Sequence, residues 1–164
     1  MNFNHACDVH SDTGYSNVCQ ICGVPSDAGY FDVADIKTAP LVGEEVEVAR
    51  YELNAQYCGA MLYFTQYAEE SGTKRQVISN TPGYEWVILC NNQPRAPYLP
   101  TTLILNPWGY TALPIHLRLE EGCTLRFVVR RVAATVAVEL SQVGGRLLGR
   151  AWYNTIYGGT PNRL

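Results

Sequence analysis

The stretch Leu113-Pro-Ile-His-Leu-Arg-Leu-Glu-Glu-Gly-Cys-Thr-Leu-Arg-Phe-Val-Val129 decides the fold class. Apolar residues alternate with polar ones on both sides of Glu120-Glu121-Gly122, and a period of two is the pattern of a half-buried β-strand. Gly122 supplies the positive φ that a tight connection between two strands requires. The stretch therefore predicts a β-hairpin.

The same period extends through the body of the chain from about residue 40, and no stretch offers a dozen residues at the helical period. Prolines and glycines separate short runs rich in Val, Leu, Tyr and Phe. The predicted strands are Glu44–Leu53, Cys58–Tyr67, Arg75–Ser79, Tyr84–Cys90, Thr101–Leu105, Ile115–Leu119, Thr124–Arg130, Val132–Leu140 and Arg146–Tyr153. Such a series of short strands predicts a mainly β chain with a β-sandwich, and a jelly roll is the commonest solution of this length.

The length of 164 residues fits one domain with short appendages. We expect a knuckle-like N-terminal segment at residues 1–24 and an extended arm or linker at 25–42, where turn formers and acids show no sustained period. The β-sandwich should occupy residues 43–156, and residues 157–164 should form a flexible tail.

The N-terminal segment carries a metal-ligand spacing, in which Cys7 and His10 are followed, after eight intervening residues, by Cys19 and Cys22. Two-residue spacing lets both ligands of a pair face one ion, so the pattern predicts a closed, structural Cys3His zinc site. Zinc would order a segment too short for a core of its own. His5 could replace His10 as the fourth ligand, and a redox Cys-x-x-Cys pair or a flexible tail without metal are the alternatives.

The composition favours a surface that contacts other molecules. Only 16% of the residues are charged, and eleven are tyrosines, which are enriched where proteins meet partners. Residues 1–70 hold eleven acids and two bases, whereas residues 71–164 hold four acids and ten bases. These opposite halves could pair within one subunit or could complement a neighbouring copy.

The sequence gives weak support for nucleic acid as a partner and none for a membrane. Lysine is nearly absent, and no basic run in the second half is longer than the two residues of Arg130–Arg131. No run approaches the roughly 20 apolar residues that span a bilayer. The N-terminus lacks a basic segment followed by an apolar one, so we expect synthesis in a reducing cytosol without secretion.

No residue pattern predicts catalysis. His116 is the only histidine after residue 10, which excludes the several histidines that a metal cupin needs. Cys58, Cys90 and Cys123 lie in or beside apolar strands, where free cysteines normally behave as small buried hydrophobes. The neighbouring carboxylates at 44/45, 69/70 and 120/121 diverge on strands or sit in solvated turns, so we expect no acid/base pair and no enzyme.

Aromatic residues offer a second interpretation. Trp86, Trp108 and Trp152 could form a platform for carbohydrate, although two of them fall in predicted strands and are expected in a core or an interface.

The segment Leu113–Val129, together with Val143-Gly-Gly-Arg-Leu-Leu-Gly-Arg-Ala-Trp-Tyr-Asn154, resembles bacteriophage capsid decoration or cement proteins of the β-sandwich or jelly-roll type. The resemblance implies a non-enzymatic virion protein that forms a homotrimer or other oligomer and clamps major capsid subunits or other virion proteins. The alternative is a ligand- or carbohydrate-binding β module, such as a receptor-binding component of a phage.

Overall fold

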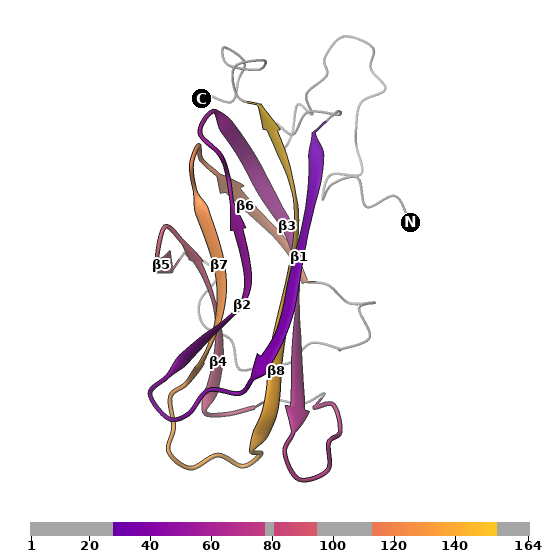
Figure 1. The fold of residues 1–164 in the computed structure, drawn as a ribbon, viewed down its shortest axis with the longest axis vertical. Helices are drawn as coiled ribbons and strands as arrows, with labels where there is room; N and C mark the ends of the chain where they lie inside the picture. Colours follow the sequence, from indigo (N-terminus) through magenta and orange to yellow (C-terminus); the bar gives the residue numbers. More distant parts are fainter. Residues whose placement is uncertain (1–27, 78–80, 95–112, 154–164) are drawn as a thin grey trace.

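Antiparallel strands build two facing sheets in the computed structural model, which describes residues 28–77, 81–94 and 113–153, without the side chains of 113–116 (Figure 1). The described part contains no helix, so none that could cross a membrane. The prediction of a mainly β chain of the β-sandwich type is confirmed. The strands are β1 (Gly29–Thr38), β2 (Glu45–Glu52), β3 (Tyr57–Glu70), β4 (Tyr84–Cys90), β5 (Gln93–Pro94), β6 (Leu113–Leu119), β7 (Thr124–Arg131) and β8 (Leu140–Tyr153).

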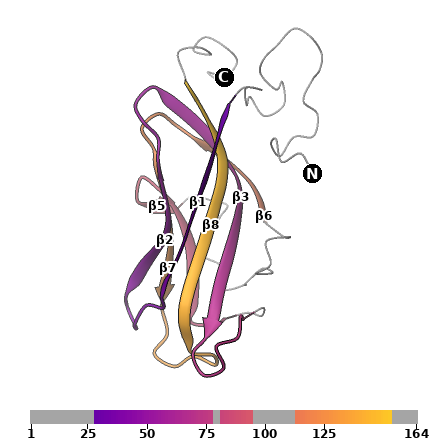
Figure 2. The same cartoon turned by 45° about the vertical axis from the view of Figure 1, so that its right-hand side comes forward.

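The first sheet has the strand order β1-β8-β3-β6 and the second has the order β2-β7-β4-β5. Early strands pair with late ones: β1 with β8, β2 with β7, β3 with β6, and β4 with β5. Figure 2 shows the two sheets as two layers, with β8 running between β1 and β3. The fold therefore brings the acid-rich first half of the chain beside the basic second half.

The segment at 25–42, predicted to be an arm outside the sandwich, contains β1, whose ten residues pair with β8 from Gly29–Ala151 to Thr38–Gln142. The prediction failed because β1 gives little periodic signal. Only Phe31 is buried along β1 and Val33 is half-buried, while the other residues of the strand are exposed. An edge strand of this kind lacks the alternation from which buried strands are recognised.

The prediction of a strand over Val132–Leu140 was wrong, because residues 132–139 form the connection from β7 to β8. Arg131 holds this connection in place. Its guanidinium donates hydrogen bonds to the carbonyl oxygens of Ala133 and Ala134, each at 3.2 Å, and forms an ion pair with Glu139. These contacts override the strand preference of the β-branched residues in the segment.

The other predicted strands have different outcomes. Tyr84–Cys90 is confirmed to the residue, and the strands predicted around β2, β3, β6, β7 and β8 are present with shifted ends. In the predicted strand Arg75–Ser79, Gln76 forms an isolated bridge with Glu69, and residues 78–80 lie outside the described part. The predicted strand Thr101–Leu105 also lies outside it.

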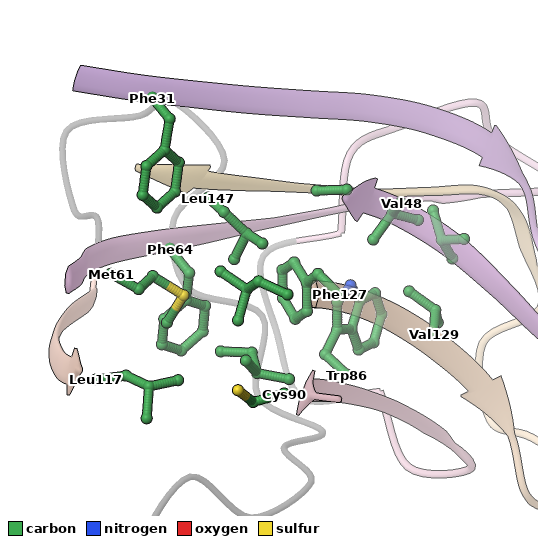
Figure 3. Packing of buried hydrophobic residues seen from close by; sticks show 14 of the residues in the cluster. Phe31, Val48, Met61, Phe64, Trp86, Cys90, Leu117, Phe127, Val129 and Leu147 are labelled. Atoms are coloured by element: carbon green, nitrogen blue, oxygen red, sulfur yellow. The ribbon is translucent and has the colours of Figure 1, made fainter. Parts of the chain in front are cut away.

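The core lies between the two sheets and is rich in large side chains (Figure 3). Phe64 of the first sheet and Phe127 of the second meet edge to face, with ring centroids 5.7 Å apart. The indole N–H of Trp86 donates to the carbonyl oxygen of Gly144 at 3.1 Å, which satisfies this polar group inside the core. A ring contact with β3 and a hydrogen bond to β8 therefore join the second sheet to the first.

Two glycines in β8 make room for rings. A Cβ atom at Gly145 would lie 2.5 Å from Cδ1 of Phe127, and one at Gly149 would lie 2.2 Å from Cζ of Phe31. Real Cβ atoms do not approach other atoms so closely, so the absence of a side chain is what lets these rings pack against the strand. β8, an inner strand of the first sheet, therefore leaves space for Phe127 of the opposite sheet and for Phe31 of the neighbouring strand β1.

Candidate functional site

The predicted zinc ligands Cys7, His10, Cys19 and Cys22, and the alternative ligand His5, lie outside the described residues. Within residues 28–77, 81–94 and 113–153 no group of three or more His, Cys, Asp and Glu side chains is placed to hold a metal ion. The zinc site stays a prediction from spacing.

The structure brings two of the three body cysteines together. Cys90, at the end of β4, and Cys123, directly before β7, form a disulfide across 33 residues, with Cα atoms 6.4 Å apart. Both are buried in the core, as predicted, but the prediction that they are free thiols was wrong. The pairing arises because β4 and β7 are neighbours in the second sheet, which brings the end of one strand beside the start of the other.

Cys58 remains a thiol and packs with Ala28 and Trp152 in a small cluster outside the main core. Desolvation by burial raises the pKa of the Cys58 thiol above its ordinary value. A raised pKa keeps the sulfur protonated at neutral pH, and the thiolate is the nucleophilic form. The side chain of His116, the only histidine after residue 10, lies outside the described residues.

The tryptophan platform is not formed by the two tryptophans that the structure describes. Trp86 is 1% exposed in the core and Trp152 is 5% exposed in the cluster with Cys58. Trp108 lies outside the described residues. Trp86 and Trp152 therefore stabilise the fold and offer no open face for a sugar ring.

The adjacent carboxylates Glu69 and Glu70 serve local structure. Glu69 accepts a hydrogen bond from the Ser141 hydroxyl at 2.7 Å and lies 3.8 Å from the ammonium of Lys74. Glu70 accepts one from the Thr73 hydroxyl within the turn that follows β3. Each carboxylate is held by different partners, which is not the arrangement of an acid/base pair acting on one substrate.

Opposite charges of the two halves pair within one chain among the described residues, which is one of the two possibilities left open by the sequence. On the first sheet Arg146 contacts Asp32 at 2.5 Å and 2.7 Å through two nitrogens. On the second sheet β2 carries the acids and β7 the bases, and the pairs there are Glu45–Arg130 at 2.9 Å and Glu47–Arg126 at 2.5 Å. These pairs join early strands to late strands, so part of the lopsided charge is balanced within the chain.

The Asp32–Arg146 pair also shifts the pKa values of both side chains. The hydrogen bond from the Arg146 guanidinium, with a smaller coulombic contribution from the same group, lowers the pKa of Asp32 below its ordinary value of 3.8. The same hydrogen bond raises the pKa of Arg146. Both side chains are about half exposed, so water screens the pair and its net stabilisation is small.

Exposed aliphatic side chains gather at one end of the sandwich, where β1 ends, β2 begins and β7 ends. Leu41 is 67% exposed, Val42 is 52% exposed and Val132 is 55% exposed, and we call these three residues the aliphatic end. The Gly43 amide donates to the carbonyl oxygen of Arg131 at 2.9 Å, which holds the turn that carries Leu41 and Val42 against the end of β7.

The local sequence explains why these side chains point outward. The Glu44 amide closes a turn by donating to the carbonyl oxygen of Leu41 at 2.9 Å, and Gly43 adopts a φ of +80° at its third position. This is the geometry that favours glycine in a type II turn, and it leaves the first two side chains on the outside. The run Pro40-Leu-Val-Gly43 could have signalled an apolar turn, but no local pattern connects it with Val132.

A polar pocket of about 420 Å³ opens on the outer face of the second sheet at the other end of the sandwich. Its described lining residues come from β2, from β7 and from the turn between β4 and β5, and they are Arg50, Asn91, Asn92, Thr124 and Arg126. Asn91 and Asn92 have φ values of 51° and 62°, the positive φ that a two-residue hairpin turn requires and that Asn tolerates. The Asn91-Asn92 pair directly after a predicted strand is the sequence feature that could have predicted this turn.

Comparison with known proteins gives little guidance. No protein family matches the chain, and no curated protein matches it. Among solved structures, it is similar to dimeric latent PorU from Porphyromonas gingivalis with a TM-score of 0.25 and 12% identity, over 83% of this chain and 14% of that chain. The chain spans a small part of that protein, and a likeness this slight supports no conclusion about function.

Proposed function

We propose that the chain is a non-enzymatic structural protein that assembles with other proteins through the aliphatic end. The observation that carries this proposal is the exposure of Leu41, Val42 and Val132 together at one end of the sandwich. Apolar side chains that cluster on a surface mark contact sites, because covering them removes apolar area from water at about 25 cal/mol per Å².

The charged surface supports the same proposal. The cross-strand ion pairs on the outer faces form within one chain, so the proposed contact does not depend on attraction between the opposite halves of two copies. Charged residues make up 16% of the sequence, which leaves much of the surface polar-neutral or apolar. A contact made by the aliphatic end would therefore depend on apolar area, and high salt would not weaken it.

The states of the three cysteines in the described sandwich, one disulfide and one buried thiol, favour a structural role over catalysis. Cys90 and Cys123 are joined to each other, and burial raises the pKa of Cys58, so a thiolate nucleophile is disfavoured at all three positions. We assign no catalytic residue to the chain.

The strand pairing supports the finer proposal that the sandwich is a jelly roll. In a jelly roll a long two-stranded ribbon is folded over, so that the first strand pairs with the last and the second with the last but one. The pairs β1–β8, β2–β7, β3–β6 and β4–β5 follow that rule. Jelly rolls serve both capsid and lectin domains, so this proposal narrows the architecture and leaves the partner open.

The specific role that we propose is decoration of a bacteriophage capsid, with the protein as a homotrimer or other oligomer in the virion and the major capsid protein as its partner. This role rests on the resemblance of Leu113–Val129 and Val143–Asn154. A structural zinc ion held by Cys7, His10, Cys19 and Cys22 belongs to the same proposal, as an anchor for the N-terminal segment.

Native mass spectrometry of the full chain tests the proposal. We expect an oligomer for the wild type and a monomer for Leu41→Ser/Val132→Ser, because two exposed aliphatic contacts are removed. Tyr57→Ser is the matched control, since Tyr57 is an exposed apolar residue at the start of β3, at the opposite end of the sandwich. A monomeric wild type, or a double variant that stays assembled, contradicts assembly through the aliphatic end.

The same measurement with a strong chelator tests the zinc site. One zinc ion per chain, lost in chelator and in Cys19→Ser, supports the four predicted ligands. A chain that carries no metal when purified without chelator contradicts them. This arm is independent of the oligomeric state, because the aliphatic end is formed without residues 1–24.

A further inference from the structure

We propose that the polar pocket on the second sheet binds a small oxyanion-bearing polar ligand, of which an acidic sugar is the best fit. All five described lining residues are polar, and two of them are arginines, whereas none is an acid. The pocket volume of about 420 Å³ falls in the range of roughly 300–1,000 Å³ that holds small ligands. A single sulfate would fill only a part of it.

The two arginines are brought together by the strand register. Arg50 of β2 and Arg126 of β7 are direct cross-strand partners. Like charges directly opposite one another destabilise a sheet, unless opposite charge lies nearby. Two glutamates supply part of that negative charge. Glu47 contacts both guanidinium groups, and Glu52 contacts that of Arg50. The carboxylates that pair with these arginines are not among the described lining residues, so the wall presents guanidinium groups and no acid.

Each guanidinium has more N–H groups than its contacts with the described residues use. Arg126 donates through Nε to Glu47, through Nη1 to Asn92 and through Nη2 to Glu45, which accounts for three of its five N–H groups. Arg50 donates through Nε and Nη2 to Glu52. Planar guanidinium groups with spare donors match the two oxygens of a carboxylate or sulfate.

The asparagines add donors because their acceptor oxygens are already used. The Thr124 amide donates to Oδ1 of Asn91 at 2.9 Å, and Nη1 of Arg126 donates to Oδ1 of Asn92 at 2.9 Å. The side-chain amide nitrogens of both residues therefore remain as donors toward the pocket. A donor-rich wall selects a ligand rich in acceptor oxygens, which an acidic sugar supplies through its carboxylate and its hydroxyl groups.

The wall is also fixed before a ligand arrives. The Asn91 amide donates to the carbonyl oxygen of Thr124 at 2.9 Å, so the turn and β7 hold each other by two hydrogen bonds. A pre-organised site loses less entropy on binding than a mobile one. The pocket lies where β2 ends and β7 begins, whereas the aliphatic end lies where β2 begins and β7 ends, so the two sites can act independently.

Titration of the ¹⁵N-labelled full chain by NMR, with sodium glucuronate, sodium sulfate and glucose in parallel, tests this proposal. We expect saturable shifts of the Arg50, Asn91, Asn92, Thr124 and Arg126 signals with glucuronate. Arg50→Gln should weaken glucuronate binding about tenfold or more, because a charge-assisted hydrogen bond is lost. Arg146→Gln is the matched control, since Arg146 is a half-exposed, ion-paired arginine on the other sheet.

Sulfate binding as tight as glucuronate binding would assign the site to the oxyanion alone, and tighter glucuronate binding would assign it to the acidic sugar. Three results would overturn the proposal: no saturable shift at these residues, equal binding of glucose and glucuronate, or equal weakening by Arg50→Gln and Arg146→Gln. Unchanged dispersion of the other signals in each variant shows that the fold is intact.

Discussion

The two sheets face one core but contribute to it differently. The second sheet supplies volume and a covalent link, through Trp86, Phe127 and the Cys90–Cys123 disulfide. In the first sheet, the absence of a side chain at Gly145 leaves space for the Phe127 ring. The same sheet also carries Gln66, a buried polar side chain. The contrast shows that a sandwich core need not be equally apolar on both sides, provided that one sheet fills the space that the other leaves.

The largest expected effect comes from removing the covalent link of the second sheet. The disulfide closes a segment of 33 residues, and a loop of that length corresponds to about 3–4 kcal/mol of stability. Reduction, or the double change Cys90→Ala/Cys123→Ala, should lower the free energy of unfolding by that amount in urea denaturation. The double variant is its own control, because reductant should not change it further. An unchanged urea midpoint on reduction of the wild type would show that the second sheet does not depend on the link.

Filling the space at Gly145 in the first sheet should have the next largest effect. Gly145→Ala places a Cβ within 2.5 Å of the Phe127 ring, so the sheets must separate locally, which typically costs about 1–3 kcal/mol. Gly29→Ala is the control in the same sheet, because its Cβ would meet the nearest heavy atom, an oxygen of Ala151, at 3.7 Å. Equal thermal midpoints for the two variants would contradict the inference that Gly145 makes room for the Phe127 ring.

Gln66 offers a change that should stabilise the first sheet. It is 2% exposed, and neither its amide nitrogen nor its amide oxygen has a hydrogen-bond partner among the described residues. Gln66→Met keeps the length of the side chain and removes the buried polar group, so we expect a gain of about 1–2 kcal/mol in the free energy of unfolding. Gln142→Met, at an exposed position of β8, should leave it nearly unchanged. A loss of stability in Gln66→Met would mean that the amide is satisfied in solution.

The smallest effect concerns the outer face of the first sheet. The pKa of Asp32 is lowered in the folded chain, so its carboxylate stabilises the fold above the ordinary pKa of 3.8, and this contribution is lost as the pH falls through the folded pKa. Asp32→Asn should lower the free energy of unfolding by a few tenths of a kcal/mol at pH 7 and by nothing near pH 2. Denaturation at both pH values, repeated in 1 M salt to screen the pair, measures it. A difference between variant and wild type that is the same at both pH values would exclude the ion pair as its cause.

The sequence predicted strands that show either alternation or a short apolar run between turn formers. Tyr84–Cys90 was predicted to the residue, because a run of apolar and aromatic residues between turn formers can hardly be anything else at that length. β1 was missed because an exposed edge strand has little alternation. The connection after Arg131 was mistaken for a strand because the contacts that shape it come from one side chain, which local propensity does not register.

The candidate sites depend on neighbours that are distant in sequence, and this limits what the sequence can predict about them. The ion pairs were foreseen as one of two possibilities, since the charge imbalance is visible but its placement is not. Cys90 and Cys123 meet only because β4 pairs with β7. Leu41 and Val132 share one end of the sandwich, although 90 residues separate them, because the β1–β2 turn is bonded to the end of β7.

Because β8 lies between β1 and β3, β1 cannot join the rest of the first sheet until the last described strand has been synthesised. Asp32 pairs with Arg146, which lies 114 residues further along the chain, and contacts between residues this far apart in sequence make folding slow. During synthesis, the early strands carry an excess of negative charge, and like charges discourage strands from pairing edge to edge. We expect the acid-rich half to keep nascent chains apart on the ribosome until the basic half emerges and closes both sheets.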